Sequence, residues 1–201
     1  MSIRQVVLAS SSPRRATLLR QIGLKPVIEP AATDEAIEGG LPPREIVATL
    51  ARRKAETVAA RHQGQPVAII GADTVVCVGD NVLGKPADLG DAIAMLHQLS
   101  GTTHQVHTGV CVIAGPTGRS FAEVATTEVT MRPIEQGEVA SYVSTGEPVD
   151  AAGAYAIQGR AAVFVERIVG DYTNVVGLPL AVTERLLDQA GMDITLGWSR
   201  S

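Results

Sequence analysis

The chain has 201 residues, of which 45% are hydrophobic and 19% charged, and its formal net charge is −4. This length and composition predict a folded globular chain and exclude both intrinsic disorder and a mini-protein that needs disulfides or metal to fold. The acidic balance argues against nucleic acid as a partner, because such binding depends on a basic surface. No apolar run reaches the roughly 20 residues that cross a bilayer, so we expect no membrane partner.

The first third of the chain predicts alternating strands and helices. Residues 6–9 form a short apolar run typical of a buried strand, and residues 13–22 have the pattern of a helix. A second helix is expected to begin at Pro42 or Pro43 and to carry apolar residues at helical spacing. The long run Val67–Val78 is rich in β-branched residues, which favours a strand buried on both faces.

The remainder predicts a helix over 88–99, strands over 105–114 and 120–131, a helix over 134–143, a glycine-rich loop over 146–159, a strand over 161–169 and a helix over 180–190. Strands and helices alternate first, and an antiparallel pair follows. This order indicates an α/β fold with a mixed, elongated, twisted sheet and flanking helices. No linker divides the chain, so we expect one domain over residues 1–201, with a central cleft between two lobes and a loose tail from about residue 191.

Two cysteines, Cys77 and Cys111, both lie inside apolar runs. We expect them to be buried free thiols of a reducing compartment. The opening residues lack the pattern of a signal peptide. Together these features predict a cytoplasmic protein.

A serine- and arginine-rich segment, residues 10–15 (SSSPRR), lies between the first strand and the first helix. Ser12 suits the N-cap of that helix and Pro13 its first position. Arg14 and Arg15 then fall in the first turn, where the helix already carries partial positive charge and cations are destabilising. A bound anion reverses that effect, because N–H groups, hydroxyls and guanidinium groups then converge on it. The segment therefore indicates a phosphate site, and exposed arginines paired with solvent are the alternative.

A single acidic residue, Asp73, interrupts the apolar run of the long predicted strand. A carboxylate in a doubly buried strand is costly unless it is paired or binds a metal. Gly71 and Ala72 precede it and leave room for another group to approach the backbone. Asp73 is therefore a candidate to hold a divalent cation or to deprotonate a water molecule, and an Asp at a bulge, bonded to a nearby N–H or paired with Arg or Lys, is the equally weighted alternative.

Three further features carry weaker signals. Lys85 stands in a tight turn between Gly84 and Pro86, where it can serve a phosphate as a point charge. Gln158 lies in the glycine-rich loop, and its amide offers the donor and acceptor that suit the edge of a base. The basic run over 52–54 is most simply the solvated face of a helix, with one of its three side chains able to point into the cleft.

Seven segments in order resemble the signature of the Maf family of nucleoside triphosphate pyrophosphatases. They are residues 8–15 (LASSSPRR), 51–55 (ARRKA), 71–74 (GADT), 84–86 (GKP), 99–102 (LSGT), 153–159 (GAYAIQG) and 176–179 (VGLP). Each is weak by itself, whereas all seven in order are highly specific, and the resemblance runs from about residue 6 to residue 187. It implies the α/β cleft fold shared by Maf and ITPase-like proteins, and a homodimer.

The resemblance also implies an activity and a set of site residues. A nucleoside triphosphate would be hydrolysed to the monophosphate and pyrophosphate with a divalent cation, Mg²⁺ or Mn²⁺. Asp73 matches the family's catalytic base. The residues that match its triphosphate and metal site are Ser10, Arg14, Arg15, Glu35, Lys54 and Lys85, with Glu35 and Asp73 as the metal ligands.

The identity of the base is linked in the family to the residues that match Arg14, Thr74 and Gln158. All three fit the branch that acts on dTTP and UTP, not the branch that acts on 7-methyl-GTP. A pyrimidine nucleoside triphosphate is therefore the expected small-molecule partner. One departure is Ala151, where relatives commonly carry lysine.

Two other functions use the same features. A nucleotide-binding regulator of cell division or septum formation would bind in the same cleft without turnover. An enzyme for damaged purine triphosphates such as ITP is the third hypothesis, and Thr74 with Gln158 argues against it. Product formation and a substrate panel separate these hypotheses.

Overall fold

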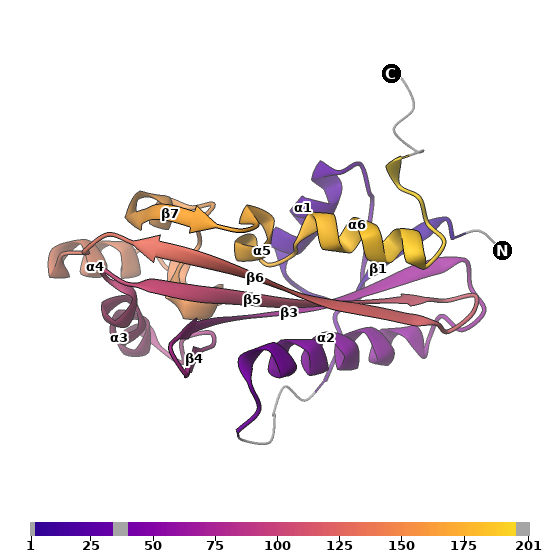
Figure 1. The fold of residues 1–201 in the computed structure, drawn as a ribbon, viewed down its shortest axis with the longest axis horizontal. Coiled ribbons are helices and arrows are strands. Elements are labelled where there is room, and N and C mark those ends of the chain that lie inside the picture. Colours follow the sequence, from indigo (N-terminus) through magenta and orange to yellow (C-terminus); the bar gives the residue numbers. More distant parts are fainter. Residues whose placement is uncertain (1–2, 34–39, 196–201) are drawn as a thin grey trace. The chain divides into compact units, whose positions relative to one another are not determined.

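The structure is a computed structural model, which describes residues 3–33 and 40–195. Its strands are β1 (Gln5–Leu8), β2 (Val27–Ile28), β3 (Val67–Val78), β4 (Asn81–Leu83), β5 (Thr103–Ala114), β6 (Ser120–Met131) and β7 (Val165–Val169) (Figure 1). Its helices are α1 (Pro13–Gln21), α2 (Pro43–Ala59), α3 (Leu89–Leu99), α4 (Gln136–Val143), α5 (Tyr172–Val176) and α6 (Leu180–Gln189). Three 3₁₀ turns complete the set: η1 (Glu147–Asp150), η2 (Ala152–Ala154) and η3 (Arg160–Phe164).

The strands form one seven-stranded mixed sheet in the order β2-β1-β3-β5-β6-β7, with β4 paired to β3. Strand β1 runs parallel to both β2 and β3, whereas β4 is antiparallel to β3 and β7 to β6. The predicted α/β class with a mixed sheet is therefore confirmed.

The chain divides into two compact units. Unit 1 comprises Met1–Asp73, Thr108–Ala125 and Gly177–Ser201, and unit 2 comprises Thr74–His107 and Thr126–Val176. Three of the four crossings between the units fall inside β3, β5 and β6, and the fourth directly follows α5. The two units thus share three continuous strands.

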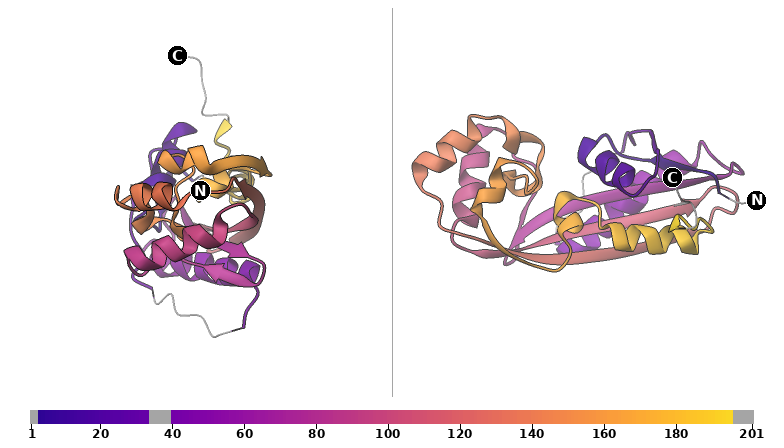
Figure 2. Two further views of the ribbon diagram at one scale, coloured as in Figure 1. Left: turned by 90° about the vertical axis from the view of Figure 1, so that its left-hand side faces the viewer. Right: turned by 90° about the horizontal axis from the view of Figure 1, so that it is seen from above.

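In unit 1, helices cover both faces of the sheet. Helix α2 lies on one face, and α1 with α6 lies on the other (Figures 1 and 2). The side chains between α2 and the sheet form one buried apolar cluster: Val7, Ala9, Ala51, Ala55, Val58, Val67, Ile69, Cys111 and Ile113. Alternate residues of the strands supply this cluster, because successive side chains of a strand point to opposite faces.

In unit 2, α3 packs against α4 and the η2 turn. Asp88 caps α3 by accepting a hydrogen bond from the Asp91 N–H at 2.8 Å. Helix α4 begins with a capping box between Glu135 and Glu138, and the Arg132 guanidinium lies 2.7 Å from the Glu138 carboxylate. That ion pair holds the pKa of Glu138 at about 2, mainly through its hydrogen bond.

The strand expected over 161–169 is wrong in its first half. Arg160–Phe164 form the 3₁₀ turn η3, and only Val165–Val169 pair with β6, where the register shifts between Thr130 and Met131. Strands β2 and β4 and helix α5, which have two, three and five residues, were not predicted. Ile194 is buried, so the ordered packing of unit 1 extends past residue 191.

Both cysteines are buried and free, as expected. Burial raises the pKa of Cys77 to about 11, so that thiol stays protonated at neutral pH. Across residues 3–33 and 40–195, the helices are too short or too polar to cross a bilayer.

Candidate active site

A buried ion pair joins α2 to β3 at Asp73, the only acidic residue of that strand. Lys54 of α2 brings its Nζ to 2.6 Å from Asp73 Oδ1, and the two side chains are only 10% and 12% exposed. Arg52 and Arg53 beside it are exposed. The basic run is therefore a solvated helix face from which one member, Lys54, turns inward to the carboxylate.

Two glycines explain why α2 lies close enough for this contact. A Cβ at Gly71 would stand 2.7 Å from the Ala55 backbone nitrogen, and one at Gly109 would stand 2.6 Å from the Val47 carbonyl carbon. Real Cβ atoms do not approach backbone that closely, so only glycine fits at both positions. The room beside Gly71 is thus taken by α2 itself.

The first turn of α1 carries the predicted cationic arrangement. Ser12 occupies the N-cap position, but its side chain makes no capping bond. Instead Ser10 Oγ accepts a hydrogen bond from the Ser12 N–H at 3.2 Å. No acidic residue lies in the first turn, so Arg14 and Arg15 add positive charge to the positive end of the helix dipole.

Arg15 also connects two of the sequence motifs. Its Nη1 donates to Ser10 Oγ at 3.1 Å, and its Nε donates to the carbonyl oxygen of Gly177 at 2.8 Å. This bond brings segment 8–15 next to Gly177 of segment 176–179, within unit 1. Ser10 is buried and accepts from both Ser12 and Arg15, which fixes its hydroxyl.

Unit 2 brings two more motifs together. The Gly153 N–H donates to the carbonyl oxygen of Gly84 at 2.9 Å, which joins the turn of Lys85 to the glycine-rich loop. Lys85 is exposed, and its Nζ lies 3.4 Å from Asp150 Oδ1. Thr74, the first residue of unit 2, is half-buried in β3.

The glycine-rich loop is shaped by two consecutive residues in the left-handed region. Gly153 has φ +68° and Ala154 has φ +57°. A Cβ on Gly153 would also meet Val76 Cγ2 at 2.9 Å. A left-handed alanine is costly and persists only where its surroundings hold it, so this loop is tightly determined.

Sequence reasoning missed the side chains that hold this loop. Tyr155 is buried, and its hydroxyl lies 2.9 Å from Nε2 of His104. Tyr142 and Glu147 contact the far end of the loop. Tyr142 and Glu147 do not stand out in the sequence, because each belongs to an ordinary apolar or polar pattern; the strong turn signal of Gly159 was the available hint.

The expected metal ligand Glu35 lies outside the described residues. Within 3–33 and 40–195, no three His, Cys, Asp or Glu side chains gather as a metal cluster. Mg²⁺ is commonly held by one or two carboxylates together with substrate phosphates. The Asp73 carboxylate is a hard oxygen donor of that kind, so the residues present fit such a cation.

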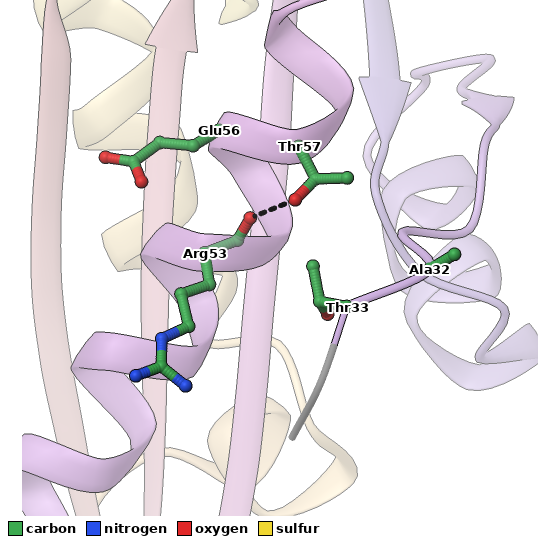
Figure 3. Close-up of a pocket in the computed structure, with 5 residues that line it drawn as sticks. All are labelled: Ala32, Thr33, Arg53, Glu56 and Thr57. Atoms are coloured by element: carbon green, nitrogen blue, oxygen red, sulfur yellow. Dashed lines mark hydrogen bonds between the residues drawn. The ribbon is translucent and has the colours of Figure 1, made fainter. Parts of the chain in front are cut away.

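A shallow hollow lies on the outer side of α2. Its lining residues are Ala32, Thr33, Arg53, Glu56 and Thr57 (Figure 3). Thr57 Oγ1 is occupied by a 2.9 Å hydrogen bond to the carbonyl oxygen of Arg53. None of the predicted site residues in the described part of the chain lines this hollow.

Comparison with known proteins defines first the fold and then the family. The structure resembles that of the Ham1 protein of Staphylococcus aureus with a TM-score of 0.51, over 92% of this chain and 99% of that one, at 13% sequence identity. This likeness shows a shared fold. The Maf-like protein family matches residues 5–190, so the chain belongs to that family.

Curated relatives cover the chain almost completely. A dTTP/UTP pyrophosphatase of Pelotomaculum thermopropionicum is 47% identical over 192 residues, which are 96% of this chain and 100% of the relative. Relatives with the same name from Anaeromyxobacter dehalogenans (48% identical, 98% of each chain) and Symbiobacterium thermophilum (47% identical, 97% and 98%) are similar to the same extent. The family predicted from the seven motifs is confirmed.

Proposed function

We propose that this protein hydrolyses dTTP and UTP to the nucleoside monophosphate and pyrophosphate. The observation that carries the proposal is the buried pair between Lys54 of α2 and Asp73 of β3, in a chain nearly half identical to relatives named dTTP/UTP pyrophosphatase. A buried carboxylate with a fixed partner has the restricted geometry that proton transfer at a reacting centre needs.

Asp73 is assigned as the general base. Lys54 holds Oδ1, and Oδ2 accepts a proton from the attacking water. The water oxygen bonds to the α-phosphorus, and the bond from that phosphorus to the α,β-bridging oxygen breaks. The electron pair leaves on pyrophosphate, so one water is consumed and the proton stays on Asp73 until it returns to solvent.

The cationic groups are assigned to the phosphates. The start of α1 offers backbone N–H groups together with Ser10 and Arg14, and Arg15 keeps Ser10 in place while adding its own charge. Lys85 is assigned as a further point charge on the phosphates. Such groups lower the barrier by stabilising the negative charge that develops on the leaving pyrophosphate.

Asp73 and Glu35 are the residues that would hold a divalent cation, Mg²⁺ or Mn²⁺. When bound, the cation neutralises phosphate charge and lowers the pKa of nearby water. The proposal predicts that a chelator abolishes turnover and that either ion restores it.

Base choice is assigned to Arg14, Thr74 and Gln158. Gln158 is exposed in its loop, and its amide can pair with the donor and acceptor edge of a pyrimidine. A site built for such hydrogen bonds rejects a base that leaves them unpaired.

We also propose that the protein is a cytoplasmic homodimer. The two free thiols support the cytoplasmic location, and light scattering tests the dimer.

The test is pyrophosphate release from dTTP, UTP, ITP, GTP and 7-methyl-GTP with Mg²⁺ or Mn²⁺. We expect equal amounts of monophosphate and pyrophosphate from dTTP and UTP. In isotopically labelled water, attack on the α-phosphorus places the label in the monophosphate. Asp73→Asn should lower kcat by at least about a hundredfold.

Asp188→Asn is the matched control, since it removes an exposed carboxylate of α6 in the same unit. Saturable nucleotide binding without any product would instead favour the regulator of cell division. Preferential turnover of ITP would assign the chain to purine triphosphates.

A further inference from the structure

The proposed base-reading residue sits in a closed turn. The Gly159 N–H donates to the carbonyl oxygen of Ala156 at 2.9 Å, so Ile157 and Gln158 occupy the two central positions. Ile157 is buried, whereas Gln158 is exposed. The turn therefore anchors one central side chain in unit 2 and presents the other.

Both ends of this turn are held by two side chains from outside it. The Ala156 N–H donates to the hydroxyl of Tyr142 at 3.2 Å, and that hydroxyl donates to Glu147 Oε1 at 3.0 Å. The same Oε1 accepts the Arg160 N–H at 2.9 Å. Tyr142 and Glu147, here called the clamp, thus bond the residue that opens the turn and the residue that follows it.

The clamp is sheltered and closely fitted. Tyr142 is buried in α4, and the Glu147 side chain at the start of η1 is 19% exposed. A Cβ at Gly159 would stand 2.7 Å from Glu147 Oε2, so only glycine leaves room for the carboxylate. A carboxylate that accepts several charge-assisted hydrogen bonds holds its partners firmly.

We propose that the clamp of Tyr142 and Glu147 is a positioning device that sets base selectivity by fixing the turn of Gln158. This inference rests on the proposed function, in which Gln158 reads the pyrimidine edge. Discrimination by hydrogen bonds depends on donors and acceptors being held in place before the base arrives. The two clamp residues touch no substrate in this scheme and act only through the turn.

Three variants test the clamp in different ways. Tyr142→Phe removes the bridging hydroxyl, and Glu147→Gln removes the charge while keeping the size. Gly159→Ala leaves both residues intact and displaces the carboxylate, whose side-chain end can swing away. Glu138→Gln is the matched control, because that carboxylate, like Glu147 with Arg160, accepts a backbone N–H and pairs with an arginine side chain in unit 2.

The readout is the ratio of dissociation constants for non-hydrolysable analogues of GTP and UTP, measured by equilibrium binding. We expect each clamp variant to lower this preference for UTP by about tenfold, and Glu138→Gln to leave it unchanged. Tyr142→Phe with Glu147→Gln should lose no more than either alone, because the clamp acts as one unit. In a Gln158→Ala background the clamp variants should have no further effect.

Three outcomes overturn the inference. They are unchanged selectivity in the folded variants, an undiminished effect in the Gln158→Ala background, and a Gln158→Ala protein as selective as the wild type. Pyrophosphate release, assayed separately, tests the proposed function. If selectivity for the UTP analogue depends on the clamp but no product is released, the proposed activity is wrong and this inference still holds.

Discussion

At the scale of single residues, the Lys54–Asp73 pair is the most consequential contact. Removing two charges from water costs several kcal/mol each, and their mutual attraction repays this only while both are present. The pair is therefore a poor stabiliser overall but a strong constraint on the position of Asp73. Little net stabilisation together with a fixed carboxylate is expected where the charged group has a catalytic role.

Removing the charge of Lys54 alone should show how costly an unpaired Asp73 carboxylate is. We expect Lys54→Met to lower the free energy of unfolding by about 3–5 kcal/mol, because it strands a buried carboxylate. The double variant Lys54→Met with Asp73→Leu should regain most of that loss while staying inactive. Urea denaturation measures both, and equal stability of the single and double variants would contradict the reasoning.

At the same scale, His104 makes the stability of the folded protein depend on pH. Its Nε2 faces Tyr155, its Nδ1 is buried with no hydrogen-bond partner in the described part of the chain, and burial lowers its pKa to about 4. The folded protein thus keeps this ring neutral. Below pH 6.5 the unfolded chain binds a proton that the folded chain does not, so stability falls as the pH drops towards 4.

This loss should reach roughly 2–3 kcal/mol at pH 4. Urea midpoints compared between pH 7.5 and pH 4.0 measure it. His104→Gln, which can still bond the Tyr155 hydroxyl, should lack this part of the slope. A variant with the same pH slope as the wild type would assign the effect to other groups.

At the scale of elements, the close packing of α2 against the sheet determines the position of the Lys54–Asp73 pair. Gly71 of β3 and Gly109 of β5 each face helix backbone at a distance that no side chain tolerates. The helix consequently lies against both strands, and Lys54, one residue before Ala55 and three after Ala51, reaches Asp73. The ion pair depends on this backbone approach as much as on its own charges.

Gly71→Ala should therefore destabilise the fold by about 1–3 kcal/mol and lower activity, since α2 must move away from β3. Gly137→Ala is the control: Gly137 is helical, nothing lies within 4 Å of its added Cβ, and alanine there should stabilise by up to about 1 kcal/mol. Thermal unfolding of both variants checks the pair of predictions. A stable and active Gly71→Ala protein would contradict the close approach.

At the scale of the whole molecule, strands β3, β5 and β6 each pass from one compact unit into the other. Unfolding either unit therefore frays strands that the other unit uses. This connectivity predicts a single cooperative transition despite the two units.

The three tyrosines test this cooperativity, because Tyr142, Tyr155 and Tyr172 all lie in unit 2. In a Trp198→Phe background, tyrosine near-ultraviolet circular dichroism reports unit 2, while the far-ultraviolet signal reports both units. The two urea curves should coincide. Separate midpoints would show that the units unfold independently.

The sequence by itself determined the elements with strong local patterns. The prediction gave the exact bounds of two strands, Val67–Val78 and Ser120–Met131. A long apolar run rich in β-branched residues and an alternating run both favour a strand. Residues 161–164 were mistaken for strand, since a short apolar run looks the same in a strand and in a buried turn. The family followed from seven short motifs and needed no structure.

Tertiary structure alone decided which residues meet. No local pattern distinguishes Lys54 from its basic neighbours, assigns Gly71 to α2 instead of a ligand, or connects Glu147 with the N–H of Arg160. Periodicity encodes which side chains are buried, because burial depends on the face of an element. Partners far apart in the chain are set by the packing of those elements, and the proposed catalytic pair and the clamp are both contacts of that kind.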